Sequence, residues 1–319
     1  MRIVFLGSGE FGRESLKKLS ERNHEILEVV TQPARRSGRG RKVTPTPIAR
    51  LAEQLKLPIS ETDNVNEPNC VEHIRSLGPE LLLVIAFGQK IGPALLKQRD
   101  FRTVNLHGSL LPKYRGAAPI NWAIINGDRE TGITLIEMDE GWDTGDILGQ
   151  HKTAIKPGET AGELHDRLAQ MGPGLLSEVL DRIVQGTDEP IKQDESRASR
   201  APKLKKSDGA IHWTQSAEKI SCQIHGMWPW PGSFCRLQQK GREKTERVNV
   251  ARVEFLPESP PTATVGVREP GMIIDDMSVL CGEGKLRLLE VKPENGKLMP
   301  FGDFVNGRHI QSGDCFLDG

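Results

Sequence analysis

The strongest constraint on the fold is a regular alternation, through the first 185 residues, of short apolar runs with helix-length amphipathic stretches. This is the pattern of βαβ units, which build a mostly parallel, doubly wound sheet. The expected strands are residues 2–6, 25–32, 80–88, 103–107 and 133–139. The expected helices are residues 11–22, 46–57, 69–77, 117–126 and 161–185. We therefore expect an α/β, Rossmann-like N-terminal domain with helices on both faces of the sheet.

A different pattern follows this part of the chain. Residues 189–208 are polar, basic and interrupted by proline, which is typical of a linker. Beyond them, short apolar runs separated by glycine and proline, with one helix over residues 216–227, predict a small antiparallel β-barrel of the OB type. The expected strands of this barrel are residues 210–213, 232–237, 247–256, 271–275, 278–281 and 285–291. We predict a domain over residues 1–188, a linker over 189–208 and an OB-like domain over 209–319.

The composition narrows the class of protein. A chain of 319 residues is long enough to bury two cores, and its formal net charge of zero means that nucleic-acid contacts would depend on local patches. The five cysteines form no C-x-x-C spacing, which argues against a disulfide framework or structural zinc and for a reducing compartment. No apolar stretch approaches the roughly 20 residues of a membrane span. We expect a cytoplasmic monomer with no membrane segment and no metal.

Three polar side chains form the candidate catalytic set. Asn105 and His107 lie two residues apart in an expected strand, so they project from the same face. Asp143 follows the next expected strand in a glycine-flanked turn, and the ends of two parallel strands would open on the same crevice. An amide, an imidazole and a carboxylate suit a reaction that builds negative charge on a carbonyl oxygen and moves protons near neutral pH. In a purely structural role, the imidazole would be a hydrogen-bonded core group and the carboxylate a turn former.

The glycine-rich turn after the first strand suggests an alternative function. Gly7-Ser-Gly9-Glu-Phe-Gly12 follows a strand and opens a helix, as in dinucleotide-binding proteins. The second strand ends in Thr31-Gln-Pro33 without the acidic residue that binds the ribose of NAD, although Arg35 and Arg36 would suit the 2′-phosphate of NADP. An NADP-dependent oxidoreductase is therefore an alternative. Hydride transfer, however, gives no reason for the amide, imidazole and carboxylate set.

Two basic segments stand out from the neutral whole. Residues 33–50 and 197–206 are rich in Arg and Lys and contain no Asp or Glu. A charge run is usually a solvated surface, but one of these lies beside the expected crevice and the other leads into the OB-like domain. Phosphate contacts at such places would position a nucleic acid without reading its bases. A non-catalytic RNA-binding module is therefore a further alternative.

The motifs also carry a family resemblance. Three stretches of the N-terminal part resemble the formyltransferases that use 10-formyltetrahydrofolate. They are Asn105-x-His107 with Ser109-Leu-Leu-Pro112, Arg115-Gly-Ala-Ala-Pro-Ile120 and Met138-Asp-x-Gly-x-Asp143-Thr-Gly145. Other stretches resemble those members that act on methionyl-tRNA. Their inserted loop is similar to Thr31-Gln-Pro33 with Gly38-Arg39-Gly40 and Thr46-Pro47. Their C-terminal domain is similar to Trp228-Pro-Trp-Pro-Gly232 and Phe304-Val-Asn-Gly307. The resemblance covers nearly the whole chain.

This resemblance implies an enzyme that transfers the formyl group of 10-formyltetrahydrofolate to the α-amino group of methionyl-initiator-tRNA for translation initiation. It makes Asn105, His107 and Asp143 the catalytic residues. It implies a folate site formed by Ser109, Leu110, Leu111, Pro112, Phe87, Gly88, Gln89 and Asp139. It implies tRNA contacts by Arg39, Arg41, Lys42, Lys203 and Lys206.

The sequence departs from the family pattern at two places. Trp142 stands where a smaller apolar residue is usual, which leaves the shape of the folate pocket open. Ser8-Gly9 stands where many relatives have Thr-Pro, away from the chemistry. The nearest alternative is a folate-dependent formyltransferase that acts on a small amine, such as a nucleotide sugar or glycinamide ribotide. Such an enzyme would not need the two basic segments.

Overall fold

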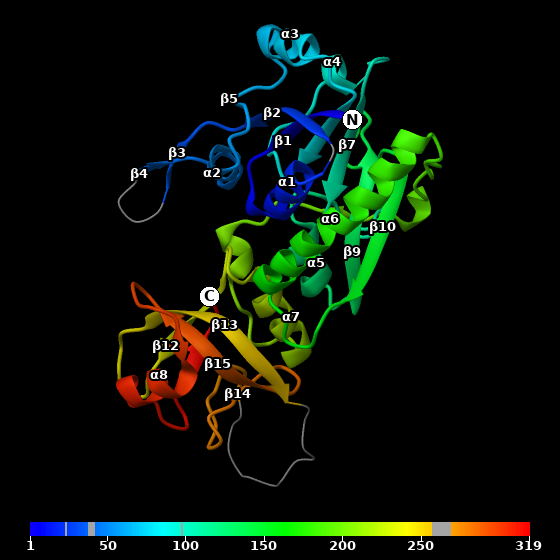
Figure 1. Cartoon of the computed structure of the whole chain (residues 1–319). Coiled ribbons are helices and arrows are strands. Elements are labelled where there is room, and N and C mark those ends of the chain that lie inside the picture. Colours follow the sequence, from blue (N-terminus) through cyan, green and yellow to red (C-terminus); the bar gives the residue numbers. More distant parts are fainter. Residues whose placement is uncertain (23, 38–41, 97, 257–268) are drawn as a thin grey trace. The chain divides into compact units, whose positions relative to one another are not determined.

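The computed structural model describes residues 1–22, 24–37, 42–96, 98–256 and 269–319 (Figure 1). The chain separates into two compact units. The N-terminal unit comprises Met1–Gly116, Thr131–Thr153 and His165–Ala201. The C-terminal unit comprises Ala117–Glu130, Ala154–Leu164 and Pro202–Gly319.

A seven-stranded sheet forms the centre of the N-terminal unit. In spatial order its strands are β10 (Ile147–Ala154), β9 (Glu130–Glu137), β7 (Arg102–His107), β6 (Leu81–Ile85), β1 (Arg2–Gly7), β2 (Glu25–Thr31) and β5 (Ile59–Glu61). The five strands from β7 to β5 run parallel to one another, which confirms the predicted mostly parallel sheet. Strands β5 and β10 are the two members of this sheet that the sequence pattern did not predict.

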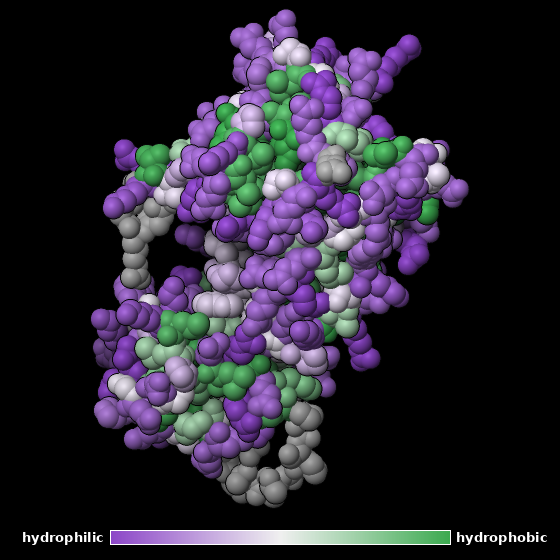
Figure 2. All heavy atoms as spheres, in the orientation of Figure 1, coloured by the Kyte–Doolittle hydropathy of each residue, from purple (hydrophilic) through white to green (hydrophobic). Residues whose placement is uncertain are grey.

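The helices of this unit follow from local sequence as well as from burial. They are α1 (Arg13–Ser20), α2 (Pro47–Gln54), α3 (Pro68–Ser76), α4 (Pro93–Leu96) and most of α6 (Ala161–Gln185), with the short 3₁₀ turns η1 (Glu10–Gly12) and η2 (Glu195–Arg197). At the start of α2, the Thr46 hydroxyl accepts the Ala49 N–H at 3.0 Å and Pro47 occupies the first helical position. The side of α6 seen in Figure 2 is mainly hydrophilic, while Leu168 and Leu180 are fully buried.

The pairing of β7 with β9 differs from the prediction. These strands are antiparallel, with His107 opposite Thr134 and Val104 opposite Glu137. The expectation that their two C-terminal ends open on the same crevice is therefore wrong. The chain enters β9 at the end of the sheet where it left β7, because the intervening helix α5 (Pro119–Ile125) belongs to the C-terminal unit and provides no crossover.

The C-terminal unit is a nearly closed antiparallel barrel, as predicted. Its strands follow the order β14 (Val279–Leu280), β15 (Lys285–Pro293), β13 (Glu246–Leu256), β12 (Ser233–Gln238) and β17 (Cys315–Leu317), with β16 (Met299–Pro300) beside β15. Residues 210–213 and 271–275, expected as strands, form only isolated bridges. Helices α7 (Ala217–Met227) and α8 (Phe301–Arg308) and the turn η3 (Lys206–Gly209) belong to this unit together with α5, and α8 was not predicted. Trp213 stacks on Phe316 in the core, with ring centroids 5.9 Å apart.

One buried imidazole links the stability of this unit to pH. His225 in α7 is 5% exposed, and its Nε2 accepts the Val253 N–H at 3.3 Å. Burial lowers the pKa of His225 from 6.5 to about 4. Below pH 6.5 the unfolded chain therefore protonates this ring while the folded chain keeps it neutral, so stability falls as the pH drops from 6.5 toward 4.

We predict that His225→Gln makes the stability of the protein less dependent on pH in this window. The glutamine side chain can accept the Val253 N–H but binds no proton, so a loss on the order of 3 kcal/mol between pH 6.5 and 4 disappears. Thermal unfolding from pH 4 to 7 measures the slope, with His309→Gln, at an exposed position, as the matched control. Equal slopes for wild type and His225→Gln would contradict this account.

Candidate active site

Strand β7 places an amide and an imidazole on one face of the sheet. Asn105 and His107 alternate with buried neighbours, so their side chains project in the same direction. His107 is 6% exposed, and Asn105 is half-buried. The Asn105 amide has no hydrogen-bond partner in the described part of the chain, so its donors and its acceptor are available to a ligand.

One hydrogen bond of His107 shows which of its two ring nitrogens can take up or release a proton. The distance between His107 Nε2 and the Tyr114 carbonyl oxygen is 3.0 Å. A carbonyl oxygen can only accept, so Nε2 carries a hydrogen and donates it. The remaining position that can bind or release a proton is Nδ1, and it faces Asp143 Oδ2 at 3.6 Å. Any proton transfer by this ring therefore takes place at Nδ1.

Asp143 reaches the imidazole from the far end of β9. Its Oδ2 accepts the Gly116 N–H at 2.8 Å, and its side chain is 16% exposed. Because Glu137 ends β9 opposite the start of β7, residues 138–146 must run back along the sheet to bring the carboxylate to His107. Asp143 itself has φ +54°, a left-handed conformation that is uncommon for non-glycine residues, although Asp adopts it more readily than most.

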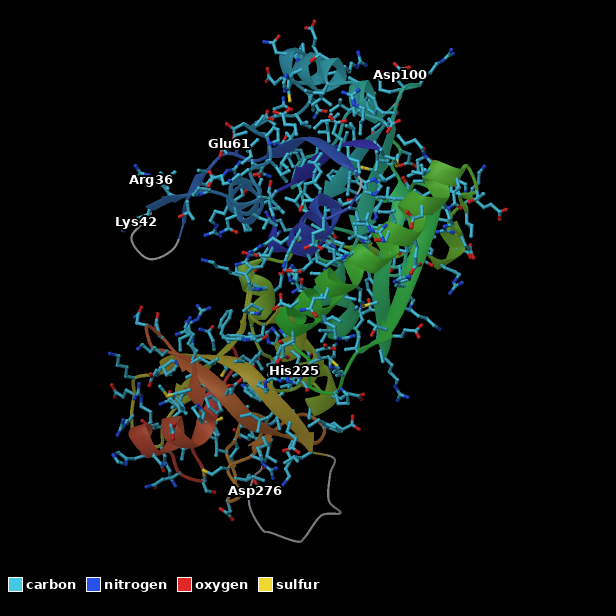
Figure 3. All side chains as sticks on the ribbon, viewed as in Figure 1. Arg36, Lys42, Glu61, Asp100, His225 and Asp276 are labelled. Carbon is cyan, nitrogen blue, oxygen red and sulfur yellow. The ribbon has the colours of Figure 1, made fainter. Side chains whose placement is uncertain are left out.

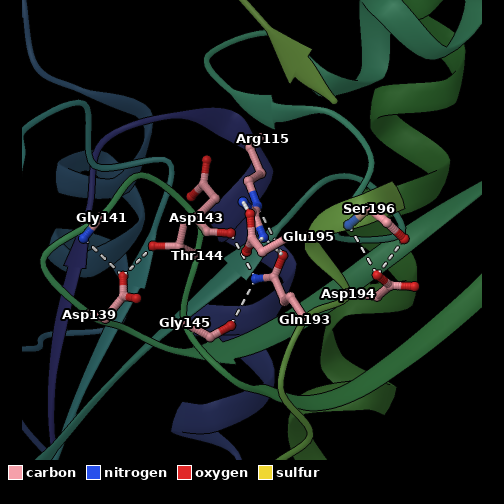
Figure 4. A network of polar contacts seen from close by, with 10 residues as sticks. All are labelled: Arg115, Asp139, Gly141, Asp143, Thr144, Gly145, Gln193, Asp194, Glu195 and Ser196. Carbon is pink, nitrogen blue, oxygen red and sulfur yellow. Dashed lines mark hydrogen bonds and ion pairs between the residues drawn. The ribbon is translucent and has the colours of Figure 1, made fainter. Parts of the chain in front are cut away.

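A network of polar contacts imposes that conformation (Figure 4). The Gln193 amide donates from Nε2 to the carbonyl oxygens of Asp143 and Gly145, both at 2.8 Å. Its Oε1 accepts from Arg115 Nε at 3.0 Å and from Nη2 at 2.8 Å, so both donors and both acceptor positions of this side chain are used. Sequence reasoning missed Gln193, because it lies in the expected linker and in none of the motifs.

Two carboxylates complete the network. Glu195 forms a two-point ion pair with Arg115, at 2.9 and 2.7 Å, and this hydrogen bonding lowers the pKa of Glu195. Asp139 Oδ1 accepts the Gly141 N–H at 2.9 Å and the Thr144 hydroxyl at 2.6 Å, which closes the turn around residues 140–143. Asp139 was expected to contact folate, and one of its two oxygens is occupied by this internal turn.

The backbone of the segment Ser109–Pro112 is held by hydrogen bonds to side chains of β9 and β10. Thr134 donates its hydroxyl to the Ser109 carbonyl at 2.6 Å and accepts the Leu111 N–H at 3.1 Å. Gln150 donates to the Leu111 carbonyl at 2.8 Å. The side chains of Ser109 and Leu111 are buried, whereas those of Leu110 and Pro112 are half-buried. All four were expected to contact folate, and of these Leu110 and Pro112 present side-chain surface to a ligand.

The turn after β6 is similarly fixed. Phe87 is buried, and its carbonyl accepts from Gln32 Nε2 at 2.9 Å. Gly88 has φ +79°, which suits glycine. Gln89 accepts the Val65 N–H and donates to the Thr62 carbonyl, both at 2.7 Å. The three residues thus form a rigid wall, and the side chain of Gln89 is engaged within the protein.

The first basic segment forms a β-hairpin with a cavity at its base. Strands β3 (Arg35–Ser37) and β4 (Lys42–Thr44) pair antiparallel, and Figure 3 shows Arg36 and Lys42 on the hairpin, away from the main sheet. The cavity, of about 520 Å³, is lined by the turns after β1 and β6, the base of the hairpin and the start of α2, and Arg35 and Arg50 contribute to it. Arg39 and Arg41, which were predicted to bind tRNA, lie outside the described residues.

The remaining basic residues lie in the C-terminal unit. Lys203 and Lys206 are both exposed there. In the described part of the chain, no three His, Cys, Asp or Glu side chains are grouped so that they could hold a metal ion. Among the described helices, none has the length and apolar character needed to cross a membrane.

Comparison with known proteins gives matches along nearly the whole chain. A family model described as formyl transferase matches residues 1–180, and one described as formyl transferase, C-terminal domain, matches residues 203–309. The methionyl-tRNA formyltransferase of Citrifermentans bemidjiense is 44% identical over 98% of this chain and 95% of its own length. That of Caldanaerobacter subterraneus subsp. tengcongensis is 40% identical over 98% of this chain and 99% of its own length.

Solved structures share the fold at lower identity. A methionyl-tRNA formyltransferase from Clostridium thermocellum superposes with a TM-score of 0.55 at 19% identity, covering 80% of this chain and 94% of that one. The sugar 3N-formyl transferase WlaRD, in the presence of dTDP and 5-N-formyl-THF, superposes with a TM-score of 0.63 at 17% identity, covering 92% of this chain and 97% of that one. At these identities the two structures establish the architecture alone.

We predict that Gly145→Ala disrupts the loop that carries Asp143. A Cβ atom at Gly145 would lie 1.7 Å from the Glu137 carbonyl oxygen, so the loop must leave its place against β9. The expected loss is on the order of 2–4 kcal/mol of unfolding free energy. Gly302→Ala is the control, because a Cβ atom there meets nothing within 4 Å. Denaturant unfolding measures both, and equal stabilities of the two variants would refute the tight return of this loop.

Proposed function

Because the chain belongs to the methionyl-tRNA formyltransferase family, we propose that it formylates the α-amino group of methionyl-initiator-tRNA with 10-formyltetrahydrofolate as donor. The observation that carries the proposal is the meeting of His107 Nδ1 and Asp143 Oδ2 beside the unpartnered Asn105 amide. Relatives named for this activity match 98% of the chain at 44% identity, and their agreement with the N- and C-terminal family models favours the tRNA substrate over a small amine or NADP.

The chemistry requires a neutral amine and a stabilised oxyanion. An α-amino group titrates at about 7.7–8.0, so much of it is charged at pH 7 and must lose a proton before it attacks. Its nitrogen bonds to the formyl carbon and gives a tetrahedral oxyanion, to which the Asn105 NH₂ donates. The bond from that carbon to N10 of the folate then breaks, and a proton originating from the amine ends on N10.

His107 and Asp143 handle the proton in this scheme. Nδ1 of His107 accepts and returns it, because Nε2 stays bonded to the Tyr114 carbonyl. When the ring carries both protons, the Asp143 carboxylate at 3.6 Å offsets its charge. The Gly116 N–H holds that carboxylate in place at 2.8 Å. No covalent intermediate with the protein is needed, since the amine attacks the formyl carbon directly.

We assign the donor site to the two rigid segments that border the catalytic residues. Ser109–Pro112 would supply the half-buried side chains of Leu110 and Pro112, and the turn at Phe87, Gly88 and Gln89 would supply the opposite wall. Asp139 would contribute its second carboxylate oxygen. The backbone groups and apolar surfaces of these segments are already fixed by internal hydrogen bonds. Little order is therefore lost when a flat, polar ring system binds between them, which favours its binding.

We assign the acceptor site to the basic segments. The hairpin carries Lys42, and Arg39 and Arg41 belong to the same segment, while Lys203 and Lys206 lie beyond it in the chain. In this assignment residues 1–188 hold the catalytic chemistry, residues 189–208 connect and residues 209–319 bind tRNA. The protein acts as a monomer in the cytoplasm, where translation begins.

A direct assay tests the proposed function. The protein is incubated with 10-formyltetrahydrofolate and, in separate reactions, charged initiator tRNA, free methionine, a dTDP-amino sugar or glycinamide ribotide. The absorbance change of the folate reports turnover, and we expect it only with charged tRNA. Turnover with a small amine and none with methionyl-tRNA would overturn the proposal in favour of a small-molecule formyltransferase.

We predict that His107→Ala and Asn105→Ala each lower kcat by about 100- to 1000-fold, because one loses the proton carrier and the other an oxyanion donor. The affinity for methionyl-tRNA should stay within about twofold of wild type, because neither side chain belongs to the basic segments. His151→Ala serves as the control, since this ring pairs with Glu178 away from the loop of Asp143. A folded His107→Ala protein with wild-type turnover would exclude the proposed role.

We predict that the double variant Arg36→Gln/Lys42→Gln raises KM for tRNA while KM for folate is unchanged. The loss of two phosphate-binding charges should also flatten the dependence of tRNA affinity on log salt by about 2. Lys17→Gln/Lys56→Gln removes the same charge from elsewhere in the unit and is the matched control. An effect on folate alone, or equal effects in both double variants, would argue against a hairpin that binds tRNA.

A further inference from the structure

Trp142 is a large apolar side chain that faces solvent next to the catalytic carboxylate. It is 64% exposed, whereas the side chain of Asp143, the next residue, is 16% exposed. A single exposed apolar residue is common on proteins and has no meaning by itself. Here, however, the neighbouring Lys90 places its ammonium 5.5 Å from the centre of the indole ring. The pair joins the loop after β9 to the turn after β6.

Both members of this pair stand on rigid backbone. The Trp142 loop is closed by Asp139, which binds Gly141 and Thr144, and is anchored at Asp143 and Gly145 by Gln193. The carbonyl of Lys90 accepts from Asn66 Nδ2 at 2.9 Å, which ties the turn after β6 to the segment behind it. An exposed indole on so constrained a loop loses little further freedom when a ligand covers it.

The Lys90 ammonium also has no anionic partner among the described residues. Within the described ranges its ammonium forms no ion pair or hydrogen bond, and it lies over the indole ring. An aromatic face and a free cation together suit a ligand that carries a planar ring and an anionic group a few atoms beyond it. The aminobenzoyl-glutamate portion of a folate has this composition, with one carboxylate on the α-carbon and another at the end of the side chain or on further glutamates.

The order of the strands favours the donor over the tRNA as the occupant. The loop of Trp142 follows β9 and the turn of Lys90 follows β6, and these two strands flank β7 with its catalytic residues. The basic hairpin follows β2, which lies on the other side of β6, beyond β1. The Trp142 loop and the basic hairpin thus follow strands that lie on opposite sides of β6.

We propose that Trp142 and Lys90 form an outer subsite for the tail of the formyl donor. The indole stacks on the aminobenzoyl ring, and Lys90 pairs with the glutamate carboxylates, so that donors with several glutamates bind more tightly than those with one. This inference rests on the proposed function. It adds a specificity-determining surface outside the residues that the chemistry requires.

The experiment compares three donors in formylation of charged initiator tRNA: 10-formyltetrahydropteroate, which lacks glutamate, and the monoglutamate and triglutamate of 10-formyltetrahydrofolate. Trp142→Leu should raise KM for all three donors by about tenfold, because each retains the aminobenzoyl ring. Trp142→Phe should restore most of this loss. Lys90→Gln should remove the advantage of the triglutamate and leave the donor without glutamate unaffected, while Lys17→Gln should change nothing.

Two further readouts separate this role from a merely structural one. In all of these variants kcat and KM for tRNA should stay within about twofold of wild type, because the pair touches the donor tail and not the reacting atoms. Titration with the triglutamate should quench an emission component in wild type that Trp142→Leu lacks. Unchanged donor KM in Trp142→Leu would overturn the proposal, and a raised KM for tRNA instead would place the indole against the tRNA end. If wild type transfers no formyl group at all, the proposed function fails and not the subsite alone.

Discussion

The carboxylate of Asp143, held between His107 Nδ1 and the Gly116 N–H, is the contact on which the arrangement of the site depends. Strand β9 ends at the opposite end of the sheet from His107, so nothing in the strand topology brings Asp143 to the imidazole. The return of residues 138–146 along the sheet does so, and it holds a left-handed backbone at Asp143. Strain of this kind persists only where surrounding contacts determine it, which is common at functional sites.

Those contacts come from a distant part of the sequence. Gln193 binds the backbone on both sides of Thr144, and its other end is fixed by Arg115, which in turn pairs with Glu195. Slightly further on, β11 (Arg200–Ala201) pairs in parallel with β8 (Arg115–Gly116), next to the N–H that holds Asp143. The segment between the large helix α6 and the barrel therefore supports the geometry of the candidate site as well as connecting the two units.

Much of the architecture could be predicted because local pattern and burial agree. The apolar run of β1 is buried along nearly its whole length, and α6 begins and ends at the predicted residues, Ala161 and Gln185. The placement of Asn105 and His107 on one face needed only the period of a strand. Both the mostly parallel sheet and the barrel are confirmed.

The rest depended on tertiary contacts that no local pattern contains. Only Leu148 of β10 is buried, and the strand includes Gly149, Gln150 and Lys152, so it has little apolar periodicity of its own. Helix α8 contains two glycines and forms because Phe301 and Phe304 are buried in the barrel core. Strand β9 runs antiparallel to β7 because α5 packs in the other unit. Gln193 holds the backbone of Asp143 and Gly145 because the segment after α6 returns to that loop. The assignments of individual residues to folate and tRNA stay predictions.

Helix α5 can be buried only after the C-terminal part of the chain has been synthesised. It lies between the catalytic loops in sequence, yet it packs on α7 so closely that Gly226 leaves no room for a side chain beside Ile125, and Asn121 donates to the carbonyl of Gly226 at 2.8 Å. These partners are 105 residues apart in the sequence. During synthesis the apolar side of α5, with Ile120 and Ile124, therefore stays exposed until α7 has emerged from the ribosome. A nascent chain cut short before the barrel would leave that side uncovered, and the completed C-terminus therefore protects a segment from the middle of the chain.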